Sequence, residues 1–231
     1  MTSPSTRPTA RQLLVAVICF VIVLGGAFLA ASLTQEKEIF SLSPPAEKNA
    51  LADVQVPPDI RETQRLDLHR TFFTAWAAII LVTPALCTFL FRRSSRSAAG
   101  YWLAFWTVSF IAFLIHFYWA VAVIFSSDWC RIFNTTRVSA ALPDLIFTFW
   151  WGLDVVRAWF VQSEERFIRI ERALVHLFAF VLFFAGSALE GEIWWSKALG
   201  FAMATAVLIA FLIWLIRWLK SRKPTVAHAC I

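Results

Sequence analysis

Six long apolar runs constrain this chain more than any other feature of its sequence. A transmembrane α-helix needs about 20 consecutive, mostly apolar residues, within a range of about 17 to 25. Runs of this kind lie at about residues 13–31, 71–91, 101–125, 139–160, 173–189 and 198–216. They predict an all-α integral membrane bundle of six transmembrane helices, which forms a single membrane domain over residues 1–231.

The composition supports this class and argues against a nucleic-acid-binding protein. Hydrophobic residues make up 59% of the chain and charged residues only 16%, which lies outside the usual range of soluble domains. The net charge is +6, but most basic residues fall in short loops between apolar runs. Charge placed there sets the orientation of a membrane protein. We therefore expect the lipid bilayer, and no nucleic acid, as a partner.

The distribution of Lys and Arg predicts the topology. With the N-terminus on the inner side, 13 basic residues fall inside and 8 outside, and five of those eight lie in the long segment 32–70. Charge in a long loop has less influence on orientation. We predict an N-in/C-in arrangement in a bacterial cytoplasmic (inner) membrane. A signal peptide ending near Ala31 is the alternative for the first run, but 19 residues exceed the h-region of about 7 to 15 that signal peptides use.

The only sizeable polar segment, 32–70, lies between the first two predicted helices. Pro44-Pro45 and Pro57-Pro58 favour an extended path. Asp59 with Glu62 resembles a capping box, so we expect a helix to begin there and to continue through His69 into the second span. The segment is either a solvated linker or a strap that docks on a partner subunit or on the protein's own outer face.

Polar and small residues form one stripe on the third predicted helix and one on the fourth. They recur at three- and four-residue steps, which place them on one helix face. The stripes are Ser109, Ala112, His116 and Ala120, and Ala141, Asp144, Thr148 and Gly152. His116 and Asp144 would lie roughly 5 Å apart in depth. An uncompensated charge in lipid is costly, so Asp144 should be protonated, hydrogen-bonded or paired. His116 is its nearest candidate partner, and the two residues would form either a structural clamp or a proton-relay or ligand site. The third alternative is that they do not meet.

Two further ionisable residues have simpler interpretations. Asp154 lies three residues before Arg157, and an i,i+3 pair near the inner interface would account for it. His176 lies close to the inner end of the fifth span, where we predict an interfacial side chain. Helix packing is predicted at small residues, which let helices approach closely in lipid; they are Gly26, Ala30, Ala112, Gly152, Gly200 and Ala204.

No metal or cofactor motif is present in the sequence. The four cysteines are scattered without metal-ligand spacing, and His116 and His176 are predicted near opposite faces, which disfavours haem ligation by both. The run from Phe149 to Asp154 resembles the Trp-rich, Asp-ended motif of bacterial haem-handling proteins of cytochrome c assembly, some of which also have six spans. Here the run lies inside a predicted helix instead of an outer loop, so no residue role is transferred.

These features favour a non-catalytic accessory or assembly subunit that binds other membrane-protein subunits or a second copy of itself. A small proton- or ion-coupled transporter using His116 and Asp144 is the first alternative. A membrane redox or haem-handling subunit is the second, although clustered His, Cys and carboxylate residues are scarce.

Overall fold

The computed structural model describes residues 7–42, 60–135, 141–161, 165–191 and 193–221, and over these residues it contains helices and no strands. In chain order the helical elements are α1 (Ala10–Thr34), η1 (Glu62–Gln64), α2 (Arg65–Phe89), α3 (Arg96–Tyr118), η2 (Trp119–Ile124), α4 (Trp129–Asn134), α5 (Ala141–Phe160), α6 (Arg166–Phe184), η3 (Ala185–Leu189) and α7 (Trp194–Ser221). The predicted all-α class is confirmed.

Five of these helices are long and apolar enough to cross a membrane, by length and composition. They are α1, η1 with α2, α3 with η2, α6 with η3, and α7. The fourth predicted span corresponds to α5, which is not among the five. It contains Asp144, Asp154 and Arg157 within 20 residues, and charged residues lower the hydropathy of a short helix steeply.

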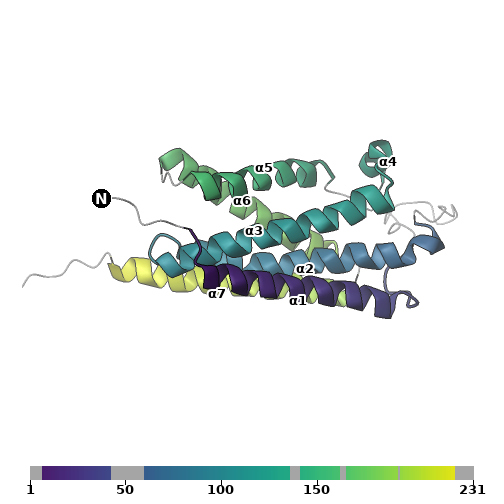
Figure 1. Cartoon of the computed structure of the whole chain (residues 1–231), viewed down its shortest axis with the longest axis horizontal. Helices are drawn as coiled ribbons and strands as arrows, with labels where there is room; N and C mark the ends of the chain where they lie inside the picture. The colour runs from purple at the N-terminus through teal and green to yellow at the C-terminus, as the bar shows by residue number, and fades with distance from the viewer. Residues whose placement is uncertain (1–6, 43–59, 136–140, 162–164, 192, 222–231) are drawn as a thin grey trace, which may run out of the picture.

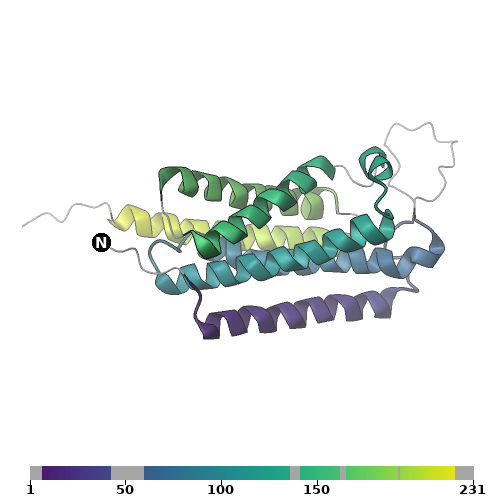
Figure 2. The ribbon, with the colours of Figure 1, turned by 45° about the horizontal axis from the view of Figure 1, so that its top comes forward.

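The long helices lie side by side in one bundle (Figures 1 and 2). The antiparallel pair α2 and α3 forms its centre, α1 packs against both, and α7 packs against α2. On the other side α5 packs against α3 and α6, and α6 also packs against α7 and α2. The start of α1, the α2–α3 connection and the end of α7 lie at the same end of the bundle (Figure 2). We call it the arginine end, because Arg92, Arg93 and Arg96 lie there.

Small residues allow close helix contacts at several of the predicted positions. Ala112 is fully buried, and a Cβ atom at Gly152 would lie 3.0 Å from the ring of Phe110 on α3. At Gly200, a Cβ atom would overlap Oγ of Ser187 and lie 2.9 Å from the backbone nitrogen of Ala188. Glycine therefore permits the contact between α7 and η3 that a side chain would prevent.

The predicted small-residue face of α1 lies elsewhere on the helix. Gly26 is exposed, and a Cβ atom there would have nothing within 4 Å, while Ala30 is half-buried. In this part of α1 the buried residues are instead Ala27 and Ala31, each one position further along the chain. Because one residue turns a helix by about 100°, these alanines belong to a different face from Gly26.

Parts of the polar segment pack against the bundle at the end opposite the arginines. Phe40 is 2% exposed and stacks on Phe72 of α2 with ring centroids 4.0 Å apart. The ring of His69 is fully buried, and its Nδ1 lies 2.9 Å from the hydroxyl of Thr34. These parts are not a solvated linker, and the helix that continues through His69 is present from Arg65. Asp59 and the rest of 43–59 lie outside the described residues.

Candidate functional site

The structure does not bring His116 and Asp144 together. Nδ1 of His116 lies 2.9 Å from the carbonyl oxygen of Thr71, so its partner is on α2 instead of α5. Among the described residues, no hydrogen bond or ion pair joins His116 to Asp144. Thr148 follows Asp144 by one turn, and its hydroxyl donates to the backbone carbonyl of Asp144 over 2.7 Å. The predicted stripe on α5 therefore does not form a shared polar site with His116.

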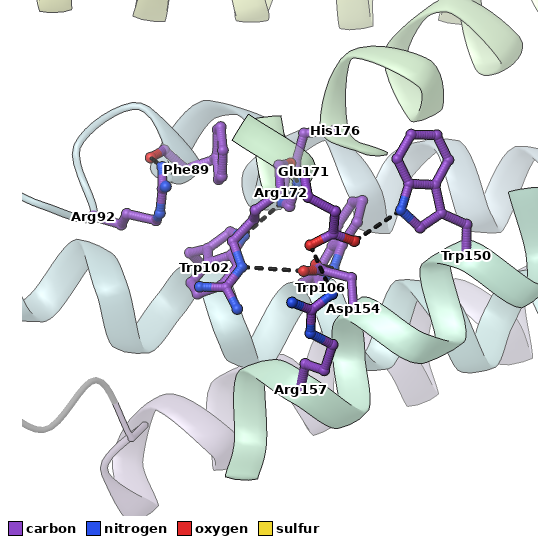
Figure 3. A network of polar contacts seen from close by, with 10 residues as sticks. All are labelled: Phe89, Arg92, Trp102, Trp106, Trp150, Asp154, Arg157, Glu171, Arg172 and His176. Carbon is purple, nitrogen blue, oxygen red and sulfur yellow. Dashed lines mark hydrogen bonds and ion pairs between the residues drawn. The ribbon is translucent and has the colours of Figure 1, made fainter. Parts of the chain in front are cut away.

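The buried acid of the bundle is Asp154, on the same helix. Its side chain has no exposed surface. Oδ1 accepts a hydrogen bond from Nε of Arg172 on α6 over 3.1 Å, and Oδ2 accepts one from the indole N–H of Trp106 on α3 over 2.8 Å (Figure 3). The predicted pair with Arg157 is wrong, because Asp154 faces the bundle interior and pairs with the next helix.

Arg172 supplies the positive charge that balances this acid. It is 5% exposed, and its guanidinium carbon lies 5.1 Å from the ring centroid of Trp102. This distance is within the range of a cation–π contact. Nη2 of Arg172 has no hydrogen-bond partner among the described residues. The guanidinium is thus held on one side by a carboxylate and on the other by the face of an indole ring.

His176 is held as a neutral ring by its two hydrogen bonds. The indole N–H of Trp102 can only donate, so Nε2 of His176, 2.7 Å away, must accept. The proton then resides on Nδ1, which lies 2.7 Å from the carbonyl oxygen of Arg172 and donates to it. The ring is 3% exposed. His176 is therefore buried between helices, and the prediction of a side chain exposed at the membrane interface is wrong.

Aromatic rings hold His176 on both faces. Its centroid lies 3.8 Å from that of Phe89 of α2 and 3.8 Å from that of Trp106 of α3, with interplanar angles of 16° in both cases. Trp106 continues the contact to Trp151 of α5, whose ring lies 4.7 Å away. One imidazole thereby joins α2, α3 and α6, and the stack extends to α5.

A second cross-helix ion pair lies beside the first. Nη1 of Arg157 on α5 lies 3.2 Å from Oε2 of Glu171 on α6, and Oε1 of Glu171 accepts the indole N–H of Trp150 over 2.8 Å. The Glu171 side chain is 13% exposed and that of Arg157 is 34% exposed. Figure 3 shows the two pairs next to each other between α5 and α6. Each helix contributes one acid and one base, so the four side chains carry no net charge.

The hydrogen-bonded residues of this region lie at two nearby depths, counted from the arginine end of their helices. Asp154 comes six residues before the end of α5, Arg172 six residues after the start of α6, and Trp102 six residues after the start of α3. At 1.5 Å per residue this is about 9 Å. Trp106 and His176 lie about 15 Å from the same helix ends. We call Trp102, Trp106, Asp154, Arg172 and His176 the polar clamp.

Comparison with protein-family models, with curated proteins and with solved structures finds no match to this chain. The chemistry of the polar clamp must therefore be inferred from its geometry alone. Both oxygens of Asp154 and both ring nitrogens of His176 accept or donate hydrogen bonds within the clamp. Within the described residues no three His, Cys, Asp or Glu side chains are grouped as a metal site would require. The arrangement suits a structural role.

Four of the five clamp residues are not among the site residues predicted from the sequence. Arg172 could have been predicted from the sequence as the partner of Asp154, because the two residues are equally far from the short α5–α6 connection. In an antiparallel hairpin, residues equally far from the turn lie opposite each other. Asp154 and Arg172 are placed symmetrically about residue 163, and Arg157 and Glu171 about residue 164. Spacing within one helix gave no such pairing.

Proposed function

We propose that this chain is a six-span integral membrane protein with both ends on the same side, and that it acts as a non-catalytic accessory or assembly subunit of a membrane complex. Helix α5 supplies the span that hydropathy alone does not support, because its buried acid is paired within the bundle. The excess of Lys and Arg at the arginine end favours the cytoplasmic side of a bacterial inner membrane for that end.

The structural role is supported by the acid and the imidazole of the polar clamp, because both oxygens of Asp154 and both ring nitrogens of His176 have hydrogen-bond partners. A proton relay needs a group that exchanges protons with a neighbour or with water. His176 instead donates to a backbone carbonyl and accepts from an indole, neither of which titrates near neutral pH. Asp154 is held by Arg172 and Trp106. These groups join helices and leave no free acid or base for chemistry.

The outer faces of the bundle favour docking to other subunits. A Cβ atom at Gly25 or Gly26 of α1 would have no other atom within 4 Å, and α1 lies at the edge of the bundle in Figure 2. Glycine on an outward face lets another helix approach closely in lipid. A protein surrounded only by lipid gains nothing from this exposed backbone.

Co-purification tests the proposal. We would purify the tagged protein in mild detergent after crosslinking in intact membranes, and compare wild type with Gly26→Leu and the control Val17→Leu. Val17 is 48% exposed on the same helix. We expect a stoichiometric membrane partner with wild type and V17L, and several-fold less of it with G26L. A protein that is recovered without any stoichiometric partner in all three samples would rule out an accessory role.

A further inference from the structure

Helix α5 differs from the other long helices in how it is held in the bundle. It is the long helix that is not apolar enough to cross a membrane alone. Its inner half is instead joined to neighbouring helices by four polar side-chain contacts. Besides the two ion pairs to α6 and the Trp106–Asp154 hydrogen bond, the indole N–H of Trp159 donates to the hydroxyl of Thr107 on α3 over 3.0 Å.

The two ion pairs are complementary between α5 and α6. Asp154 of α5 faces Arg172 of α6, and Arg157 of α5 faces Glu171 of α6. The spacing of Asp154 and Arg157 would permit a pair within α5. The structure has the two cross-helix pairs in its place. Sliding α5 along α6 by one turn would separate both pairs, so together they define one register.

Of the two ion pairs, Asp154 with Arg172 is the more deeply buried, so it has the larger effect on the cost of placing α5 in the membrane. Arg172 and Asp154 have side chains 6% and 0% exposed, whereas those of Arg157 and Glu171 are 34% and 13% exposed. A carboxylate buried in a membrane protein is costly unless it is paired or hydrogen-bonded. Before α6 is present, α5 would carry Asp154 into the bilayer without Arg172.

We propose that α5 and α6 enter the membrane as one hairpin, and that the Asp154–Arg172 pair provides the charge compensation that α5 needs to span it. This inference rests on the six-span arrangement proposed above. It assigns the buried pair to membrane insertion and register, a role distinct from docking to a partner. Its consequence is that a single charge removal on α6 changes the topology of α5.

Cysteine accessibility tests this inference. Val161, the exposed residue directly after α5, is replaced by cysteine in a chain whose own cysteines are serine. A membrane-impermeant maleimide is added to sealed vesicles. Two reference proteins mark the two sides of the membrane. One carries Ser94→Cys at the arginine end, and the other keeps only the natural Cys130 at the opposite end. The variants are Arg172→Met, the pair Asp154→Asn with Arg172→Met, and the control Arg166→Met, an exposed arginine of the same helix.

We expect V161C to react from the same side as S94C in the wild-type background and in R166M. In R172M, the fraction of V161C that reacts from the side of Cys130 should rise several-fold. The double variant D154N/R172M should return to within about twofold of wild type, because removing both charges leaves nothing uncompensated. If R172M is degraded, the amount of full-length protein replaces labelling as the readout, and the double variant should restore it.

Three outcomes decide between the proposals. Unchanged labelling and unchanged protein level in R172M would overturn the hairpin inference while the six-span arrangement stands. Failure of the double variant to restore R172M would also overturn it. Labelling of V161C from the side of Cys130 in the wild-type background would instead show that α5 does not cross the membrane, and would overturn the six-span proposal itself.

Discussion

The indole of Trp102 donates its N–H to Nε2 of His176 over 2.7 Å, and this contact fixes which nitrogen of the imidazole carries the proton. Both residues are almost fully buried. The pair joins α3 to α6 in the interior of the bundle. Its role can be measured directly because phenylalanine retains the aromatic ring at position 102 but has no donor.

Trp102→Phe should destabilise the bundle. Nε2 of His176 then loses its donor, and an unsatisfied buried polar group costs about 1–3 kcal/mol. The measurement is the free energy of unfolding in mixed micelles titrated with a denaturing detergent. The control is Trp194→Phe, because Trp194 is 66% exposed and should change stability by less than about 0.5 kcal/mol. Equal stability of the two variants would contradict the assigned hydrogen bond.

Double-mutant cycles should distinguish the observed pair from the pair suggested by the sequence. For Asp154 and Arg172 we expect a coupling energy of about 0.5–3 kcal/mol, the range for residues in direct contact. For His116 and Asp144 the effects of the two substitutions should add within about 0.5 kcal/mol, since no contact joins them. A large coupling between His116 and Asp144 would revive the transporter hypothesis.

The two ion pairs between α5 and α6 should differ in strength. Arg172→Met leaves Asp154 buried without its counter-ion and should cost about 3–5 kcal/mol. Arg157 is 34% exposed, so Arg157→Met should cost at most about 1 kcal/mol. Unfolding titrations of both variants under the same conditions give the comparison. The ranking would be wrong if R157M were the less stable protein.

Two glycines should respond oppositely to the same substitution. Gly200→Ala places a Cβ atom against Ser187 and Ala188, and overpacking of this kind costs about 1–3 kcal/mol. Gly26→Ala meets no atom within 4 Å and should leave stability unchanged or raise it by up to about 1 kcal/mol, because alanine is the better helix former. Stability of the purified single chain is the readout. A loss of stability in G26A would contradict the open surroundings of Gly26 in the structure.

The class of the protein is determined by the sequence itself. A run of about 20 apolar residues has few stable arrangements other than a helix in lipid, and the helix satisfies its backbone hydrogen bonds within the run. The runs at 13–31, 71–91, 101–125, 173–189 and 198–216 therefore locate five candidate spans without any tertiary information. The helix that continues through His69 is likewise local, because caps and hydropathy act within a few residues.

Only the tertiary structure decided the partners of the ionisable residues. Asp154 has Arg157 one turn away on its own helix, and the sequence alone favours that pair. The fold instead turns Asp154 toward α3 and α6, where Arg172 and Trp106 hold it. His116 likewise faces α2 and not Asp144. Depth follows from counting residues along each helix, but the rotation of one helix against another depends on side-chain packing among several helices, which no single stretch of sequence encodes.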